Sequence, residues 1–294
     1  MVNIVRGILG VLTVIYAFMF GKDYKESAQN GRLASEEEGP LKPAIIGAIA
    51  NFGDSLGIGS FAPIVAMSKF SKMKVHDKQI PGMLNVSCCI PVVTEALLMT
   101  TAIAVEPITL VSMLAAAGAG SYIGAGIISK MDEKKIQLVM GIALLATAIL
   151  MFLGLPWINL MPGGGNEIGL SGVKLVIGIV GNFILGALMT AGIGLYAPCM
   201  ALVYFLGMSP KVAFPIMMGS CAVLMPIASA KFIKEGQFPR KASLAITIGG
   251  VIGVFIAFYL VKSLPMDILK VLVIIVILYT SFTMLKPVLS KKQA

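Results

Sequence analysis

Two copies of one short motif contain the residues best suited to bind a small ion. The pattern Gly-Ile-Gly-x-x-Ala-Pro occupies residues 57–63 and returns at residues 192–198, and the stretches 57–73 and 192–208 agree at eight of seventeen positions. A glycine pair followed by proline ends one helix and allows another to begin. The first turn of the new helix presents free N–H groups and the positive end of its dipole, an arrangement that favours an anion.

Hydroxyl and amide side chains near the two motifs could coordinate an oxyanion without adding a competing charge. Any one serine or threonine in an apolar helix could instead bond to its own backbone. Together with the motif glycines, the polar residues form the predicted binding set, which consists of Asn51, Asp54, Ser55, Gly57, Gly59, Ser60, Asn85, Ser87, Thr190, Gly192, Gly194, Tyr196, Cys199 and Ser220.

Asp54 and Glu95 are the two ionisable residues furthest from the ends of the apolar segments. A carboxylate inside a membrane is costly and points to function by default, so either residue is a candidate carrier of a coupling proton. The alternatives are a helix-capping role for Asp54 and a paired structural role for Glu95.

Cys88, Cys199 and Cys221 also fall near the predicted centre. They could pass sulfur groups along a pathway, but small polarizable core residues also explain them, and we favour that interpretation. The four cysteines of the chain lack zinc-site spacing, and the single histidine, His76, lies in a lysine-rich loop. We expect no enzymatic activity, no metal site and no cofactor.

The composition is that of a polytopic membrane protein. Of the 294 residues, 57% are hydrophobic and only 13% are charged, whereas about a quarter of the residues in soluble domains are charged. The net charge of +9 comes from basic residues in short connections between apolar runs. This pattern is typical of membrane topology and argues against nucleic-acid binding.

Apolar runs and polar connections divide the chain into five parts. The run at 3–20 predicts an extra helix, and residues 21–43 indicate a solvated linker or surface helix. Each repeat would contain a broken segment followed by three apolar runs, at 80–104, 107–129 and 135–155 and again at 211–232, 241–262 and 266–287. The predicted parts are an N-terminal helix and polar linker (1–42), repeat 1 (43–155), an extracytoplasmic connection (156–172), repeat 2 (173–288) and a cytoplasmic tail (289–294).

Ladders of small residues support the duplication. Ala116, Gly120 and Gly124 are spaced four apart, and the same spacing recurs 133 positions later at Gly249, Gly253 and Ala257. The pair Ser87-Cys88 recurs at the same offset as Ser220-Cys221. Because small residues let helices approach closely in lipid, we expect both ladders to lie in helix interfaces.

Loop charges predict that the two repeats have opposite orientations. Basic residues gather after the first and third elements of repeat 1, at 69–78 and 130–135, but after the second and fourth elements of repeat 2, at 231–241 and in the tail. By the positive-inside rule these regions are cytoplasmic, and each broken segment must then be a hairpin that returns to the side it entered. The arms, of roughly 14–17 residues, are too short to cross, so both glycine-rich tips would lie near mid-membrane. If the broken segments each crossed once, the basic loops of repeat 2 would lie outside.

The repeated Gly-x-Gly motif with its following proline, in a duplicated membrane chain with basic loops, resembles the TauE/SafE family of sulfite-exporter permeases (TSUP) over about residues 43–288. The expected fold is an all-α polytopic membrane protein with two inverted-topology repeats, each a re-entrant hairpin plus three transmembrane helices, and one extra N-terminal helix. The family commonly has a denser glycine cluster at the tip, where this chain has Ser60 and Leu195.

The resemblance implies secondary transport of small anions, such as sulfite, sulfoacetate and other organosulfonates, across the bacterial inner membrane. The expected mechanism is alternating access, with a cytoplasmic C-terminus. Expected partners are a small anionic substrate and the lipid bilayer. Either a coupling proton or the membrane potential would supply the drive, and a homodimer is left open. Three alternatives remain: an anion channel, a thiosulfate or sulfide carrier that uses the three central cysteines, and a scaffold or sensor without transport.

Overall fold

The described part of the protein is helical, which confirms the predicted fold class. The computed structural model describes residues 2–56, 58–99, 105–155, 157–158, 160, 166–192 and 194–260, and nearer the C-terminus residues 271, 274–275, 277–279, 281–282 and 284–286. These residues contain no β-strand. The helices are α1 (Val2–Gln29), α2 (Leu41–Ser55), α3 (Phe61–Phe70), the 3-10 helix η1 (Asp77–Gln79), α4 (Ile80–Met99), α5 (Pro107–Ile128), α6 (Glu133–Leu153), α7 (Gly172–Met189), α8 (Tyr196–Phe205), α9 (Pro210–Glu235) and α10 (Arg240–Leu260).

Seven of the described helices are long and apolar enough to cross a membrane, namely α1, α4, α5, α6, α7, α9 and α10. Their bounds lie within a few residues of the apolar runs expected from the sequence, except that α1 continues to Gln29. Half of the expected run at 266–287 and seven of the seventeen residues of the connection at 156–172 lie outside the described residues, and the tail at 289–294 lies wholly outside them.

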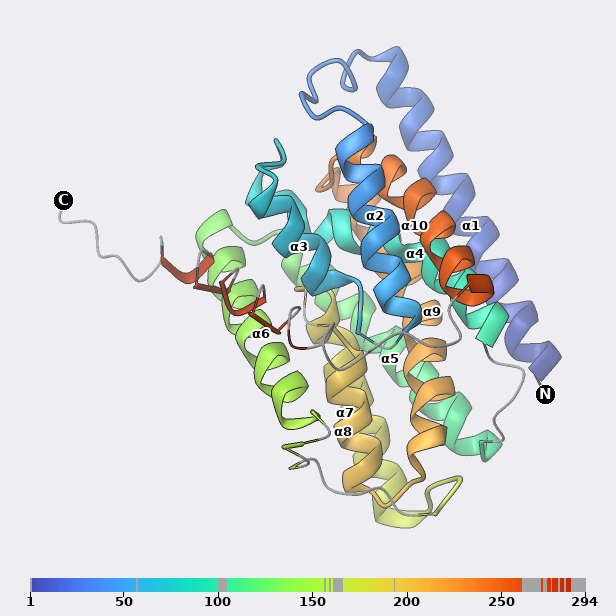
Figure 1. Ribbon diagram of the computed structural model, residues 1–294. Helices are drawn as coiled ribbons and strands as arrows, with labels where there is room; N and C mark the ends of the chain where they lie inside the picture. Colours follow the sequence, from blue (N-terminus) through green and yellow to red (C-terminus); the bar gives the residue numbers. More distant parts are fainter. Residues whose placement is uncertain are drawn as a thin grey trace.

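Both broken segments consist of two helices joined by a short turn. The pair α2 and α3 occupies the upper half of Figure 1, and the pair α7 and α8 the lower half. The second arms, α3 and α8, have only 10 residues each, fewer than the sequence suggested. Such an arm reaches about 15 Å, half the thickness of a hydrocarbon core of about 30 Å. Neither arm can cross a membrane alone.

Close contacts between glycine-containing helices join the two halves of the chain. Helix α10 packs along α2, and α5 packs along α7. A Cβ atom added to Gly249 would lie 1.9 Å from the carbonyl oxygen of Ala44, and one added to Gly120 would lie 2.0 Å from that of Phe183. The expectation that the small-residue ladders mediate helix contacts is confirmed. The third element of each half therefore holds the hairpin of the other half.

Helices α4 and α9 lie at the centre of the molecule. These two helices pack against each other, α10 also contacts α4, and α5 also contacts α9. Helix α1 lies along the outside, against α9 and α4 (Figure 1). Its buried face carries Leu9, Tyr16 and Phe20, whereas Val11, Val14 and Phe18 are exposed and available to lipid.

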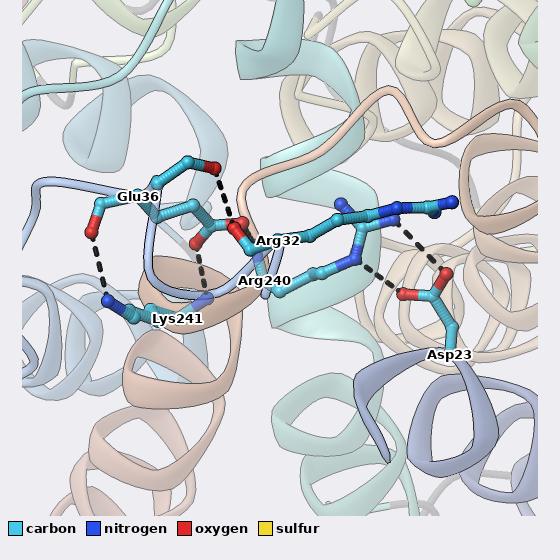
Figure 2. A network of polar contacts seen from close by, with 6 residues as sticks. Asp23, Arg32, Glu36, Arg240 and Lys241 are labelled. Atoms are coloured by element: carbon cyan, nitrogen blue, oxygen red, sulfur yellow. Dashed lines mark hydrogen bonds and ion pairs between the residues drawn. The ribbon is translucent and has the colours of Figure 1, made fainter. Parts of the chain in front are cut away.

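The polar segment after α1 is more ordered than a solvated linker, which corrects the sequence-based expectation. We call residues 30–40 the strap. The carboxylate of Glu36 accepts hydrogen bonds from the backbone N–H groups of Arg240 and Lys241, each at 2.8 Å, at the start of α10 (Figure 2). The guanidinium of Arg240 donates to both carboxylate oxygens of Asp23 on α1, at 2.8 and 3.1 Å.

The strap also contacts the loop that follows α3. The carboxylate of Glu38, which is 7% exposed, accepts a hydrogen bond of 2.6 Å from the backbone N–H of Lys74 and pairs with the ammonium of Lys42 at 3.4 Å. The acidic run was expected to be solvated, but two of its three carboxylates satisfy backbone N–H groups of other segments. The strap thus joins the loop that follows α3 to the start of α10 on one side of the molecule.

Replacing Glu36 by alanine is expected to destabilise the folded protein, because two N–H groups at the start of α10 would lose a charged acceptor. A hydrogen bond to a charged group contributes about 1.5–3 kcal/mol, so we expect a loss of about 1–3 kcal/mol, measured by thermal unfolding in detergent. Glu37→Ala is the matched control, since the ion pair of Glu37 with Lys74 joins side chains that are 71% and 63% exposed. Equal melting temperatures for the two variants would show that the strap does not stabilise α10.

Candidate functional site

The two hairpin tips need glycine at different positions of the repeated motif. Gly59 has a φ of +87° in the first tip, and Gly192 has a φ of +101° in the second. Residues that have a side chain rarely adopt this left-handed backbone conformation, so glycine is required at both places. At Gly194 the backbone is outside that region, and an added Cβ would meet nothing within 4 Å. Gly57 and Ile193 lie outside the described residues.

The carboxyl group of Asp54, near the end of α2, meets the start of α3. Its Oδ2 atom accepts a hydrogen bond of 2.8 Å from the hydroxyl of Ser60, and the backbone N–H of Ser60 also donates to the carboxyl group. Ser60 is the N-cap residue of α3. Asp54 is thus not itself the N-cap; it binds the N-cap residue from the end of α2, and its carboxyl group lies beside the helix start, where an anion is favoured.

The carboxyl group of Glu95, on α4, contacts a side chain of the other short helix. The hydroxyl of Tyr196, the first residue of α8, donates to its Oε1 atom at 3.4 Å. The Oε2 atom is buried and has no hydrogen-bond partner among the described residues. Tyr196 also interacts with Asp54, and the two carboxyl groups lie within electrostatic range of each other. Neither carboxyl group forms an ion pair with a described cation.

Two thiols lie within electrostatic range of these carboxyl groups, and a third lies within range of one of the two. Cys88 on α4 lies beside Ser60 and Asn51, and within electrostatic range of Asp54. Cys221 on α9 is within range of both carboxyl groups and of Cys199 on α8. All are free thiols, and no group of three metal-ligating side chains occurs among the described residues. The cluster therefore combines two acids, one phenol and three thiols contributed by four helices.

A second polar contact includes a residue that was missing from the predicted binding set. The amide of Asn182 on α7 donates to the hydroxyl of Ser220 on α9 at 2.8 Å and to the carbonyl oxygen of Met113 on α5 at 2.7 Å. The sequence carries a signal for it, because Gly47 and Asn51 in the first hairpin correspond to Asn182 and Gly186 in the second. The Oδ1 atoms of Asn51 and Asn182 are both buried without a partner among the described residues.

Other predicted residues bond mainly to backbone. The hydroxyl of Ser55 donates to the carbonyl oxygen of Asn51, and that of Thr190 donates to the carbonyl oxygen of Ala187. Asn85 connects α4 to the second tip through the carbonyl oxygen of Thr190 at 3.5 Å. The hydroxyl of Ser87 contacts the neighbouring Cys88 thiol at 3.8 Å. These groups shape the site, whereas Asp54, Ser60, Glu95 and Tyr196 are the ones brought together.

The predicted polar residues are all deeply buried. Each of them is at most 7% exposed; the set consists of Asn51, Asp54, Ser55, Ser60, Asn85, Ser87, Glu95, Thr190, Tyr196, Cys199 and Ser220. Buried hydroxyl, amide and carboxyl groups thus gather near the tips of both hairpins, which is the arrangement expected where short helices begin inside a membrane.

The family model of the sulfite exporter TauE/SafE matches residues 2–151 and 174–294. The chain belongs to the TauE/SafE family. The match begins at residue 2 and not near residue 43, so α1 and the strap lie within the family region, contrary to the expected extent of the resemblance. No curated protein and no solved structure gives a significant match. As a TauE/SafE protein with seven apolar helices, the chain is a multi-pass membrane protein of a transport family.

The two glycines of the second tip should respond differently to alanine. At Gly192 a side chain would be strained by the backbone, at a cost of about 1–3 kcal/mol, so we expect Gly192→Ala to reduce transport about tenfold or more. At Gly194 the space is open, and Gly194→Ala should transport like the unmodified protein. Both rates are measured in proteoliposomes at equal protein content. A Gly192→Ala rate that matches that of Gly194→Ala would mean that the tip geometry does not control transport.

Proposed function

We propose that the protein is a secondary transporter of small anions, with sulfite or organosulfonates such as sulfoacetate as substrates. The observation that carries the proposal is the pair of short helices, α3 and α8, that begin among buried polar groups. Free N–H groups and a helix dipole at each start favour a small oxyanion. The proposed contacts are the first-turn N–H groups of α8, the Tyr196 hydroxyl and the amides of Asn51 and Asn182.

Alternating access around this site is the proposed mechanism, with the two halves as inverted repeats. The packing supports it, because α2 pairs with α10 as α7 pairs with α5. The equivalent glycine contacts occur in both interfaces. Two related halves that each hold the hairpin of the other provide two similar arrangements, which a substrate can interconvert if it binds both.

The proposed location is the inner membrane, with the basic loops and the C-terminus in the cytoplasm. The strap supports this orientation. It contacts Lys74 in the basic loop at 69–78 and the start of α10 next to the basic loop at 231–241. Both basic loops therefore lie on the same side, as the positive-inside rule requires for inverted halves.

A carrier of thiosulfate or sulfide is the second candidate. The observation that favours it is the gathering of Cys88, Cys199 and Cys221 around the two carboxyl groups. On this route a thiolate would take the outer sulfur of thiosulfate as a persulfide and release sulfite, and sulfite would remove that sulfur again to re-form thiosulfate. Sulfide is already fully reduced and would be held by the thiols without covalent chemistry. Alanine at all three positions would therefore stop transport by this route, whereas anion binding at the helix starts would continue.

Flux measurements with purified protein in liposomes test both candidates. The panel is sulfite, sulfoacetate, taurine, thiosulfate and sulfate, each with and without a pH gradient, and liposomes without protein are the control. We expect saturable uptake of sulfite or sulfoacetate that survives replacement of the three cysteines. Uptake that does not saturate would indicate a channel, and absence of flux for every anion would contradict the proposed function.

A further inference from the structure

The two helix starts that form the proposed site differ in charge, although their motifs are repeats of each other. The start of α3 already holds the carboxyl group of Asp54, through the hydroxyl and N–H groups of Ser60. The residue that corresponds to Asp54 in the second half is Met189, so α8 has no acid of its own at this place. The duplication therefore provides two anion-binding helix ends and one resident anion.

The charges in the empty site balance without a substrate. Each helix start carries the equivalent of about half a positive charge, so two of them together offset about one negative charge. The carboxylate of Asp54 supplies that charge. Among the described residues no lysine, arginine or histidine forms an ion pair with Asp54 or Glu95. An arriving anion would thus leave one uncompensated charge in a buried site, which is strongly unfavourable.

The groups that face Asp54 show where a compensating proton can be held. Tyr196 on α8 interacts with both Asp54 and Glu95. The other titratable groups in range are the thiols of Cys88 on α4 and Cys221 on α9, and from α10 the nearby residue is Gly250, beside Asn51. Among these groups only a carboxyl group readily takes up and releases a proton near neutral pH, because thiols and phenols ordinarily keep theirs well above it, and Tyr196 bridges the two carboxyl groups.

The unpaired carboxyl oxygen of Glu95 indicates how the site holds the substrate anion once a proton has been taken up. Its Oε2 atom is buried without a partner among the described residues, and its Oε1 atom is contacted by the Tyr196 hydroxyl from the helix that has no resident anion. A carboxylate there would repel a substrate anion, whereas a protonated carboxyl group donates a hydrogen bond to it. Glu95 therefore keeps its proton in the empty and in the loaded state. The one proton that travels with the substrate is the one that Asp54 takes up, and its uptake releases the start of α3 to the anion.

We infer that each monovalent anion crosses together with one proton held by Asp54, Tyr196 and Glu95, so that transport moves no net charge. In the empty state the carboxylate of Asp54 occupies the start of α3. In the loaded state the proton sits on a carboxyl oxygen and the anion takes the place of that carboxylate. Both leave on the opposite side. This inference rests on the proposed function, since it requires anion transport.

The test measures anion, proton and charge movement in the same proteoliposomes. Methanesulfonate, which stays a monoanion over the working pH range, is the probe, with sulfite in parallel. Uptake is read by ion chromatography, internal pH by trapped pyranine and charge by solid-supported-membrane electrophysiology. For the unmodified protein we expect about one proton per anion and no current. Asp54→Asn should lower this ratio severalfold and produce a current, and Asp132→Asn, at the exposed start of α6, should behave like the unmodified protein.

The possible results separate a failure of the proton-coupling inference from a failure of the proposed anion transport. Uptake by the unmodified protein that carries current without acidification overturns the inference and leaves anion transport intact. An unchanged proton ratio and no current in both Asp54→Asn and Glu95→Gln also overturns it. If the unmodified protein takes up neither methanesulfonate nor sulfite, the proposed function itself is contradicted. If Asp54→Asn does not fold, the stoichiometry of the unmodified protein and of Glu95→Gln still decides.

Discussion

A helix that begins in the middle of a membrane must find partners for its first N–H groups, and this constraint organises the whole molecule. Water is absent from the hydrocarbon core, so only protein groups or a bound ligand can satisfy them. The chain meets the requirement at α3 with the carboxyl group of Asp54. The position in the second half that corresponds to Asp54 is Met189, and the carboxyl group of Glu95 instead contacts the hydroxyl of Tyr196 on α8 and keeps one oxygen without a partner among the described residues. In the proposed function this difference is what lets the site accept an anion.

The surrounding helices hold the two hairpins so that their tips stay buried. Glycines let α10 and α5 approach the backbones of α2 and α7, where any side chain would collide with a carbonyl oxygen. On one side of the molecule the strap ties α10 and the loop after α3 together through Glu36 and Glu38, and Asp23 of α1 binds Arg240 at the start of α10. Movement of one half against the other must therefore rearrange carboxylate contacts at the surface as well as polar contacts at the centre.

Features that depend on local pattern could be predicted from the sequence. The helix breaks follow from the backbone freedom of glycine and the missing N–H of proline, and the helix interfaces follow from small residues four apart. Features that depend on pairing between distant segments could not. Asn182 reaches Ser220 and Met113 on other helices, and Glu36 caps a helix that begins some two hundred residues later. The need for glycine at Gly59 and Gly192, but not at Gly194, depends on φ angles that a shared motif does not reveal.

The central claim is that a small oxyanion binds where the two short helices begin, and a heavy-atom analogue tests it directly. Selenite has the shape and charge of sulfite and scatters X-rays anomalously, so crystals grown with it would show its position. The account predicts an anomalous peak within hydrogen-bond distance of the first-turn N–H groups of α8, beside Tyr196 and between the two hairpins. A peak found only at the basic cytoplasmic loops, or no peak at saturating selenite, would contradict it.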